Sequence, residues 1–210
     1  MIVPEWLGAL PYAEALARQR ERRAAVLAGE APEALWLLEH DPPVVTVGRR
    51  PAPGNPTAEA LSADGIDFHR TERGGLATWH GPGQLVAYFI VDVFKRRLGV
   101  KGMVAAVEDG VICWLAEQGV GASRRVGYPG VWVGKGKICA LGFHFRRGVS
   151  MHGIALNLCP DLDAGFGRIF PCGIDDGGVT SLERVTGQRL TPDVVWGAVG
   201  EMLRQKMLDG

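Results

Sequence analysis

The sequence predicts an α/β protein of the α+β kind, as one domain over residues 1–210. Short apolar runs at hairpin spacing alternate with longer amphipathic segments, which is typical of an α+β or mixed α/β domain. The length of 210 residues and the hydrophobic content of 47% allow the chain to bury a large core without outside support. Neither an internal repeat nor a low-complexity tract suggests a division into two domains.

The individual elements follow from hydrophobic spacing and from turn residues. Segments 12–28 and 102–118 carry apolar side chains at helical spacing, and segment 192–207 begins with Pro192, which is favoured at the first position of a helix. Short runs rich in Val, Ile, Leu and aromatic residues, bounded by Gly, Pro and Asp, predict strands. The predicted strands are 34–38, 44–47, 66–70, 77–80, 85–93, 124–126, 131–133, 138–145 and 151–158, with short helices in 161–169 and 181–185 and a Pro/Gly loop at 51–56.

Charge and composition exclude several classes of protein. With 23 basic and 23 acidic residues the net charge is zero, which argues against general nucleic-acid binding. Apolar runs stay well below the ~18 residues that span a bilayer, and residues 1–5 lack the features of a secretory signal, so we expect a cytoplasmic protein with reduced cysteines. Because the cysteines lack a C-x-x-C spacing and the histidines lack an i, i+4 pair, we expect no metal.

Segment 73–84 is the most informative part of the chain. Its four glycines let a backbone pass close to a ligand, and Pro82 fixes a turn between two apolar runs. Such a segment contributes little to a core. It more readily shapes the wall of a pocket, with Arg73, Thr78, His80 and Gln84 available to line it.

The four cysteines differ in their surroundings. A free thiol titrates near 8.5, so a catalytic cysteine needs a nearby cation or base. Cys113 lies in an apolar helical stretch, and Cys159 ends a strand without an evident activator. Strand alternation places Cys139 on one face with Lys137 and Leu141, which makes it a rival to a cysteine in a Pro/Gly turn, Cys172.

His80 and His152 both adjoin glycines and are the histidines best placed to face a pocket. Whether His80 takes part in chemistry or orients its loop is left open by the residues alone. A cysteine hydrolase that pairs a thiol with either histidine is one alternative.

Three separated blocks carry a family resemblance, namely 73–84, 137–142, and 152–157 followed by 171–173 and 180–182. Over residues 36–182 the chain resembles the lipoyl(octanoyl) transferases, the octanoyl-[acyl-carrier-protein]:protein N-octanoyltransferases of lipoate synthesis. The resemblance implies the fold of biotin and lipoate protein ligases, which is a mixed β-sheet packed by helices. It also implies Cys172 as nucleophile, and Lys137 as the group that lowers the thiol pKa and moves protons. It implies these substrate-binding residues: Arg73, Gly74, Gly75, Leu76, Ala77, Thr78, Trp79, His80, Ala140, Leu141, Gly142, Gly153, Ile154 and Ala155.

The resemblance also implies a ping-pong transfer without a cofactor. An octanoyl-acyl carrier protein is the expected donor, and the expected acceptors are lipoyl domains of 2-oxoacid dehydrogenase complexes and the glycine cleavage H protein. We expect a monomer. The alternatives are an ATP-dependent lipoate or biotin-type protein ligase on the same fold and a non-catalytic acyl-carrier-binding module.

These implications lead to three structural expectations. An apolar tunnel should hold the acyl chain, with Leu76, Trp79, Ile154 and Leu156 in its wall. Backbone N–H groups near 141–142 or in 73–80 should bind the oxyanion. One of two basic pairs, 49–50 or 146–147, should dock the acidic donor.

Overall fold

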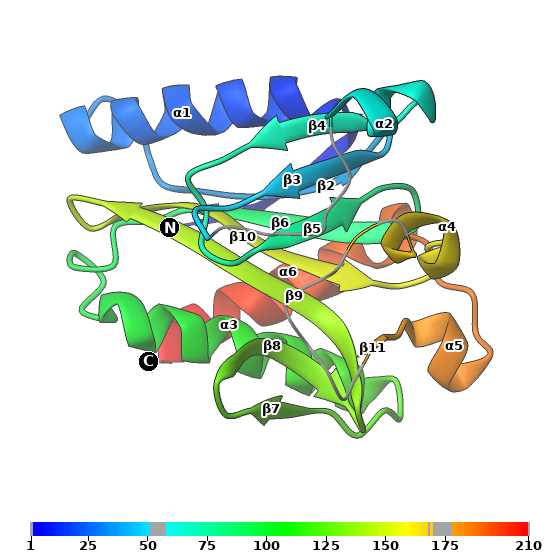
Figure 1. Ribbon diagram of the computed structural model, residues 1–210. Helices are drawn as coiled ribbons and strands as arrows, with labels where there is room; N and C mark the ends of the chain where they lie inside the picture. The colour runs from blue at the N-terminus through cyan, green and yellow to red at the C-terminus, as the bar shows by residue number, and fades with distance from the viewer. Residues whose placement is uncertain (1, 51–57, 168, 170–177, 210) are drawn as a thin grey trace.

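The computed structural model describes residues 2–50, 58–167, 169 and 178–209, and a large mixed sheet forms its centre. The strand order in this sheet is β1-β2-β6-β10-β9-β8-β7, with β11 paired to β9. A smaller sheet of three strands, β4-β3-β5, lies above it in Figure 1. The strands are β1 (Pro4–Leu10), β2 (Ala34–His40), β3 (Val44–Val47), β4 (Asp67–Arg70), β5 (Ala77–His80), β6 (Gln84–Ile90), β7 (Ser123–Arg125), β8 (Tyr128–Val133), β9 (Gly136–Arg146), β10 (Val149–Asn157) and β11 (Gly178–Val179).

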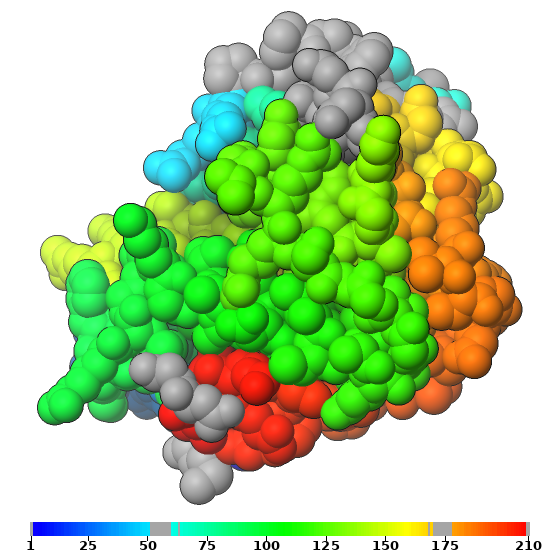
Figure 2. All heavy atoms as spheres, turned by 90° about the horizontal axis from the view of Figure 1, so that it is seen from below, coloured from blue at the N-terminus to red at the C-terminus, as the bar shows by residue number. Residues whose placement is uncertain are grey.

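Helices cover both faces of the large sheet (Figure 1). The upper face is covered by α1 and by the small sheet, and the lower face by α3 and α6. Figure 2, seen from below, shows α3 in green beside α6 in red. The helices are α1 (Tyr12–Ala28), α2 (Ala58–Ala63), α3 (Gly99–Glu117), α4 (Leu162–Phe166), α5 (Leu182–Thr186) and α6 (Pro192–Asp209).

Strand alternation divides the core into two layers, because successive side chains point to opposite faces. In β6, Leu85, Ala87 and Phe89 pack downward with α3 and α6. Val86 and Tyr88 of the same strand pack upward in the cluster that α1 covers. β6 is buried on both faces in this way, as its nearly continuous run of apolar residues allows.

The predicted strands and helices are confirmed with boundary shifts, and the loop predicted at 51–56 lies outside the described residues. The strand β1, the short helix α2 and the two-residue strand β11 were not predicted. β1 contains Pro4 and Gly8, residues that are depleted in strands, and for this reason it was not expected. It pairs with β2 on one side only, at the edge of the sheet, where Pro is tolerated. Gly8 has a φ of 75° where the register shifts between Trp6 and Ala9.

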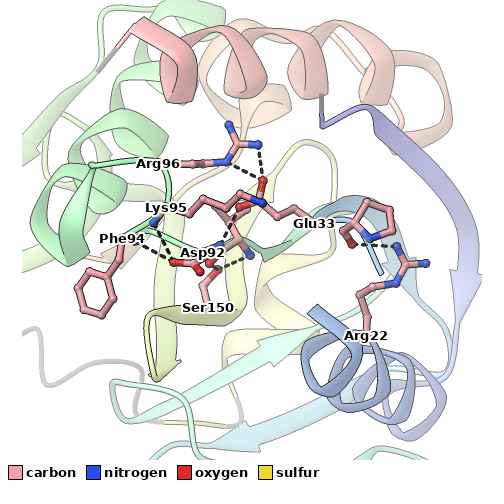
Figure 3. Close-up of polar contacts among 9 residues, drawn as sticks. Arg22, Glu33, Asp92, Phe94, Lys95, Arg96 and Ser150 are labelled. Atoms are coloured by element: carbon pink, nitrogen blue, oxygen red, sulfur yellow. Dashed lines mark hydrogen bonds and ion pairs between the residues drawn. The ribbon is translucent and has the colours of Figure 1, made fainter. Parts of the chain in front are cut away.

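The strand predicted for 85–93 ends at Ile90, and polar contacts explain its end (Figure 3). The carboxylate of Asp92 accepts hydrogen bonds from the backbone N–H groups of Phe94 and Lys95, both at 3.0 Å, which turns the chain toward α3. The carboxylate of Glu33, just before β2, accepts a hydrogen bond from the backbone N–H of Asp92 at 2.8 Å and another from the guanidinium of Arg96. These contacts join the start of β2 to the β6–α3 connection. Within the described part of the chain, the helices are too short or too polar to cross a bilayer.

Candidate active site

A pocket lies between the upper face of the large sheet and the small sheet. Its walls come from β5, β6, β9 and β10, from the loop that precedes β5, and from the first residue of α1. It holds about 550 Å³ of space, part of it open to solvent. The predicted site residues that line it are Arg73, Gly74, Gly75, Leu76, Ala77, Thr78, His80, Lys137, Ala140, Leu141, Gly142, Gly153, Ile154 and Ala155.

Two residues expected in the tunnel wall lie elsewhere. The ring of Trp79 points away from the pocket and packs against Phe166 at a centroid distance of 5.7 Å, in the core that the other face of the small sheet forms with α2 and α4. Its neighbours in β5, Thr78 and His80, face the pocket because side chains alternate along a strand. Leu156 is fully buried in the lower core, on the other face of β10 from Ala155. The wall predictions for Trp79 and Leu156 are therefore wrong.

Lys137 lies at the start of β9, and its side chain is only 6% exposed. Its Nζ lies 5.0 Å from the centroid of the Trp132 ring, a cation–π contact. The ion pairs found among the described residues do not include it. A buried ammonium group without a carboxylate partner can stabilise a developing anion in the pocket that it lines.

Lys137 and Cys139 do not share a face, contrary to the strand alternation assumed above. The register between β8 and β9 shifts between Val131 and Trp132, so that Ile138 is an extra residue in β9. This shift turns Lys137 toward the pocket together with Ala140, while Cys139 joins the lower core. Burial raises the pKa of the Cys139 thiol, and the nearby charge of Lys137 only partly opposes this rise. Cys139 is therefore a protonated, inert core residue in this fold.

The glycine loop before β5 is held by Arg73. Its guanidinium donates to the hydroxyl and carbonyl oxygens of Thr46, at 2.9 and 2.7 Å, and to the carbonyl of Gly74 at 2.9 Å. Gly74 in turn donates its N–H to the carbonyl of Phe143 at 3.0 Å, which removes this group from the candidate oxyanion donors. A Cβ on Gly142 would lie 3.1 Å from the Gly74 carbonyl, so a larger residue there would push the loop a few tenths of an ångström away from β9.

A layer of histidine and tyrosine rings lies beside the pocket. His40 donates from Nδ1 to the carbonyl of Leu10 at 2.9 Å, so its Nε2 accepts from the Tyr88 hydroxyl at 2.7 Å. Burial lowers the pKa of His40 to about 4 and that of both His80 and His152 to about 3. These three imidazoles are therefore neutral near pH 7.

Four residues that line the pocket were not among the predicted site residues: Tyr12, Val86, Tyr88 and His152. His152 adjoins a glycine, and this signal singled it out as a candidate to face a pocket without assigning it to the site. Its φ of 61° is rare for a residue other than glycine. The two tyrosines and the valine lie in an ordinary helix and a buried strand, where nothing in the sequence separates a pocket residue from a core residue.

Cys172, with the turn 171–173 that holds it, lies outside the described residues. The described residues nearest to it in the sequence on the C-terminal side are those of β11. Val179 pairs with Lys137, and Thr180 donates its N–H to the Lys137 carbonyl at 3.0 Å. The chain thus returns to the lysine strand directly after the segment that contains Cys172.

Comparisons with known proteins agree with this architecture. Residues 11–204 match the family model of the lipoyl protein ligase A/B catalytic domain. An octanoyltransferase of Novosphingobium aromaticivorans is 45% identical over 192 residues, which are 88% of this chain and 82% of that protein. An octanoyltransferase of Methylococcus capsulatus is 49% identical over 155 residues, 74% of this chain and 72% of that protein.

Solved structures share the fold at low sequence identity. The bi-partite lipoate protein ligase of Thermoplasma acidophilum superposes with a TM-score of 0.74 at 16% identity, covering 99% of this chain and 84% of that one. The biotin protein ligase of Aquifex aeolicus gives 0.57 at 15% identity, covering 98% and 70%. These likenesses confirm the predicted fold of biotin and lipoate protein ligases. The relatives at 45–49% identity are octanoyltransferases, and the family model covers residues 11–204. The chain therefore belongs to the octanoyltransferases of the lipoyl protein ligase A/B catalytic family.

Proposed function

We propose that this octanoyltransferase works in two half-reactions, with octanoyl-acyl carrier protein as donor, Cys172 as nucleophile and a lipoyl-domain lysine as acceptor. In the first half-reaction the Cys172 thiolate attacks the carbonyl carbon of the donor thioester. The carbon–sulfur bond to the carrier then breaks, and the carrier sulfur leaves as a thiolate, which takes up the proton that the Cys172 thiol lost on ionisation. The product is an S-octanoyl enzyme.

In the second half-reaction the neutral ε-amine of the acceptor lysine attacks the same carbonyl carbon. The bond to the Cys172 sulfur breaks, the amine nitrogen gives up a proton, and an octanoyl amide is released. Both steps start from a thioester, which is already activated, so neither needs ATP. The expected acceptors are lipoyl domains of 2-oxoacid dehydrogenase complexes and the glycine cleavage H protein.

The observation that carries this proposal is the buried ammonium group of Lys137 in the wall of the pocket. A cation beside a thiol lowers its pKa and increases the fraction of thiolate. The backbone contacts between Lys137 and Thr180 support a position for the lysine near the segment that contains Cys172. The protonated state of Cys139 supports Cys172 over its rival.

Intact-mass spectrometry with octanoyl-acyl carrier protein, in the absence of ATP and acceptor, tests the proposal. Wild type and Cys139→Ala should both gain a hydroxylamine-labile octanoyl group, and Cys172→Ala should not. An adduct lost only in Cys139→Ala would move the nucleophile to Cys139. If the wild-type protein gained no adduct, the two-step mechanism would be refuted, and an ATP-dependent ligase or a binding module would be favoured.

A further inference from the structure

A line of buried polar side chains connects β11 to the pocket. Asn157 donates from Nδ2 to the carbonyl of Thr180 at 3.0 Å. Gln84 donates from Nε2 to Oδ1 of Asn157 at 2.8 Å, and its Oε1 lies 2.6 Å from Nδ1 of His80. Gln84 is 1% exposed, Asn157 3% and His80 8%, so this line is shielded from water.

The directions of these hydrogen bonds follow from chemistry. A backbone carbonyl can only accept, so the amide of Asn157 turns its nitrogen toward Thr180 and its oxygen toward Gln84. Gln84 therefore turns its own nitrogen toward Asn157, and a second carbonyl, that of Trp79 at 3.4 Å, favours the same orientation. The Gln84 oxygen is left for His80, and because that oxygen only accepts, Nδ1 of His80 carries the proton.

The tautomer decides what His80 offers to the pocket. With the proton on Nδ1, its Nε2 carries a lone pair and can only accept a hydrogen bond. Within the described residues Nε2 makes no hydrogen bond, and His80 lines the pocket. Burial, followed by the neighbouring His40, lowers the pKa of His80 to about 3, so that the ring keeps this lone pair near neutral pH.

We propose that Asn157 and Gln84 are positioning residues that hold His80 in the Nδ1–H tautomer, so that Nε2 accepts a hydrogen bond from the acceptor lysine amine. This inference rests on the proposed two-step function. In the first half-reaction the attacking thiolate has no proton to donate. In the second, a neutral amine brings two N–H groups, and a hydrogen bond from one of them leaves the nitrogen lone pair free to attack the acyl carbon.

The two half-reactions respond differently to loss of the line. Gln84→Met keeps the length of the side chain and removes the strong acceptor for Nδ1–H. Transfer from the S-octanoyl enzyme to a lipoyl domain should slow on the order of 10–100-fold, the size of the penalty for leaving a buried donor without its acceptor. Formation of the octanoyl adduct from the carrier should change less than about twofold. Asn157→Leu should shift the two rates in the same direction as Gln84→Met.

Gln84→Glu is the matched control, because its carboxylate still accepts from Nδ1–H. It should transfer the acyl group faster than Gln84→Met. Adduct formation in each variant shows that the protein folds and that the first half-reaction works. Its absence from wild type would refute the proposed function, whereas an unchanged transfer rate in adduct-forming Gln84→Met would refute only this inference.

Nitrogen-15 NMR of the imidazole rings tests the tautomer directly. In wild type, the His80 resonances should show a protonated Nδ1 and an unprotonated Nε2, and Gln84→Met should lose this preference. An Nε2–H tautomer in wild type would overturn the inference. If the role of Gln84 were purely structural, Gln84→Met would lower stability but would leave the His80 tautomer unchanged and slow both half-reactions equally.

Discussion

Among the described residues, Lys137 is the one on which the proposed chemistry depends most. It is buried and lines the pocket, and its ammonium group makes a cation–π contact with the ring of Trp132. Nearby Lys135 is exposed in the turn between β8 and β9. The two lysines therefore separate the effect of a charge in the pocket from that of a charge on the surface.

Lys137→Met should raise the pKa of the Cys172 thiol, because the cation that favours the thiolate is removed. A nearby opposite charge shifts a pKa by roughly 1–3 units, so alkylation of Cys172 at pH 7 should slow about tenfold or more. Peptide-level mass spectrometry after timed iodoacetamide treatment measures the rate across pH. Lys135→Met should behave as wild type, and equal rates in all three proteins would remove Lys137 from the role of activator.

The pocket wall predicts how acyl-chain preference changes. Val86 lines the pocket, whereas Leu156 lies in the lower core. Val86→Ala should lengthen the accepted chain, with about a fourfold gain in relative kcat/KM for each added methylene that becomes buried. Competition between C8, C10 and C12 carrier thioesters measures this preference. Leu156→Ala, the matched control, should lower stability and leave the profile unchanged; a profile shifted only by Leu156→Ala would reverse the assignment of the wall.

Three buried histidines predict a loss of stability in mild acid. Burial holds the pKa of His40 at about 4 and those of His80 and His152 at about 3, below the ordinary value of 6.5 that unfolding restores. Below pH 6.5 the unfolded chain therefore binds more protons, and the free energy of unfolding falls as pH falls. By pH 5 each histidine accounts for a loss of roughly 2 kcal/mol.

Urea unfolding between pH 7.5 and 5 measures this slope. In His40→Asn the free energy of unfolding should depend less steeply on pH, because one of the three titrating histidines is gone. The variant should also be less stable at every pH, because it loses the hydrogen bond with Tyr88. A slope as steep as that of wild type would show that His40 titrates normally in the folded protein.

Two glycines show how closely the strands and the loop approach one another around the pocket. A Cβ on Gly142 would meet the Gly74 carbonyl at 3.1 Å, in a loop, whereas a Cβ on Gly153 would meet the Ala87 carbonyl at 2.1 Å, in the central strand β6. The loop can give way by a few tenths of an ångström, but the central strand is held on both sides by its neighbours. Gly142 therefore sets how closely the loop lies against β9 in the pocket wall, whereas Gly153 allows β10 to pair closely with β6.

Gly153→Ala should destabilise the protein by about 1–3 kcal/mol, as overpacked sites commonly do. Gly142→Ala should leave the melting temperature nearly unchanged and raise the donor KM by displacing the loop at Gly74. Thermal unfolding and steady-state kinetics of both variants distinguish these effects. A larger loss of stability in Gly142→Ala than in Gly153→Ala would contradict this account.

Charge on the whole molecule is balanced, yet basic side chains gather in one groove. Arg20 and Arg23 of α1 line it together with Arg146 and Arg147 at the turn between β9 and β10. Arg23 also contacts His144 of β9 at 2.9 Å. The basic pair 146–147 thus belongs to a larger cationic surface, which favours it over the pair 49–50 as the docking surface for an acidic carrier.

Charge reversal of this surface should weaken docking and spare the chemistry. Arg146→Glu combined with Arg147→Glu should raise KM for the carrier-bound donor and flatten its salt dependence, with kcat for a small octanoyl thioester unchanged. Lys95→Glu combined with Lys101→Glu, two exposed lysines at the start of α3 and in the loop before it, is the matched control. An equal rise in KM for both double variants would show that only the net charge matters, and would contradict docking at residues 146–147.

Local pattern was enough to predict most elements and the α+β class, whereas the family resemblance supplied the mixed sheet and grouped segments 73–84, 137–142 and 152–157, which contribute to the pocket. Hydrophobic period and turn residues are properties of neighbours in the chain, so they predicted α1, α3 and the hairpin of β9 and β10 with shifts of a few residues. The glycine-rich segment 73–84 and the lysine strand also stood out, because residues that a core does not need are visible in a single sequence.

Which face each side chain takes depends on contacts between distant segments. The register shift at Ile138 turns Lys137 toward the pocket and Cys139 into the core, and it arises from pairing with β8. Likewise, Trp79 packs with Phe166 and Gln84 meets Asn157 because separate elements lie against each other in three dimensions. Since a shift of one residue in pairing reverses the face of every side chain beyond it, these assignments required the folded chain.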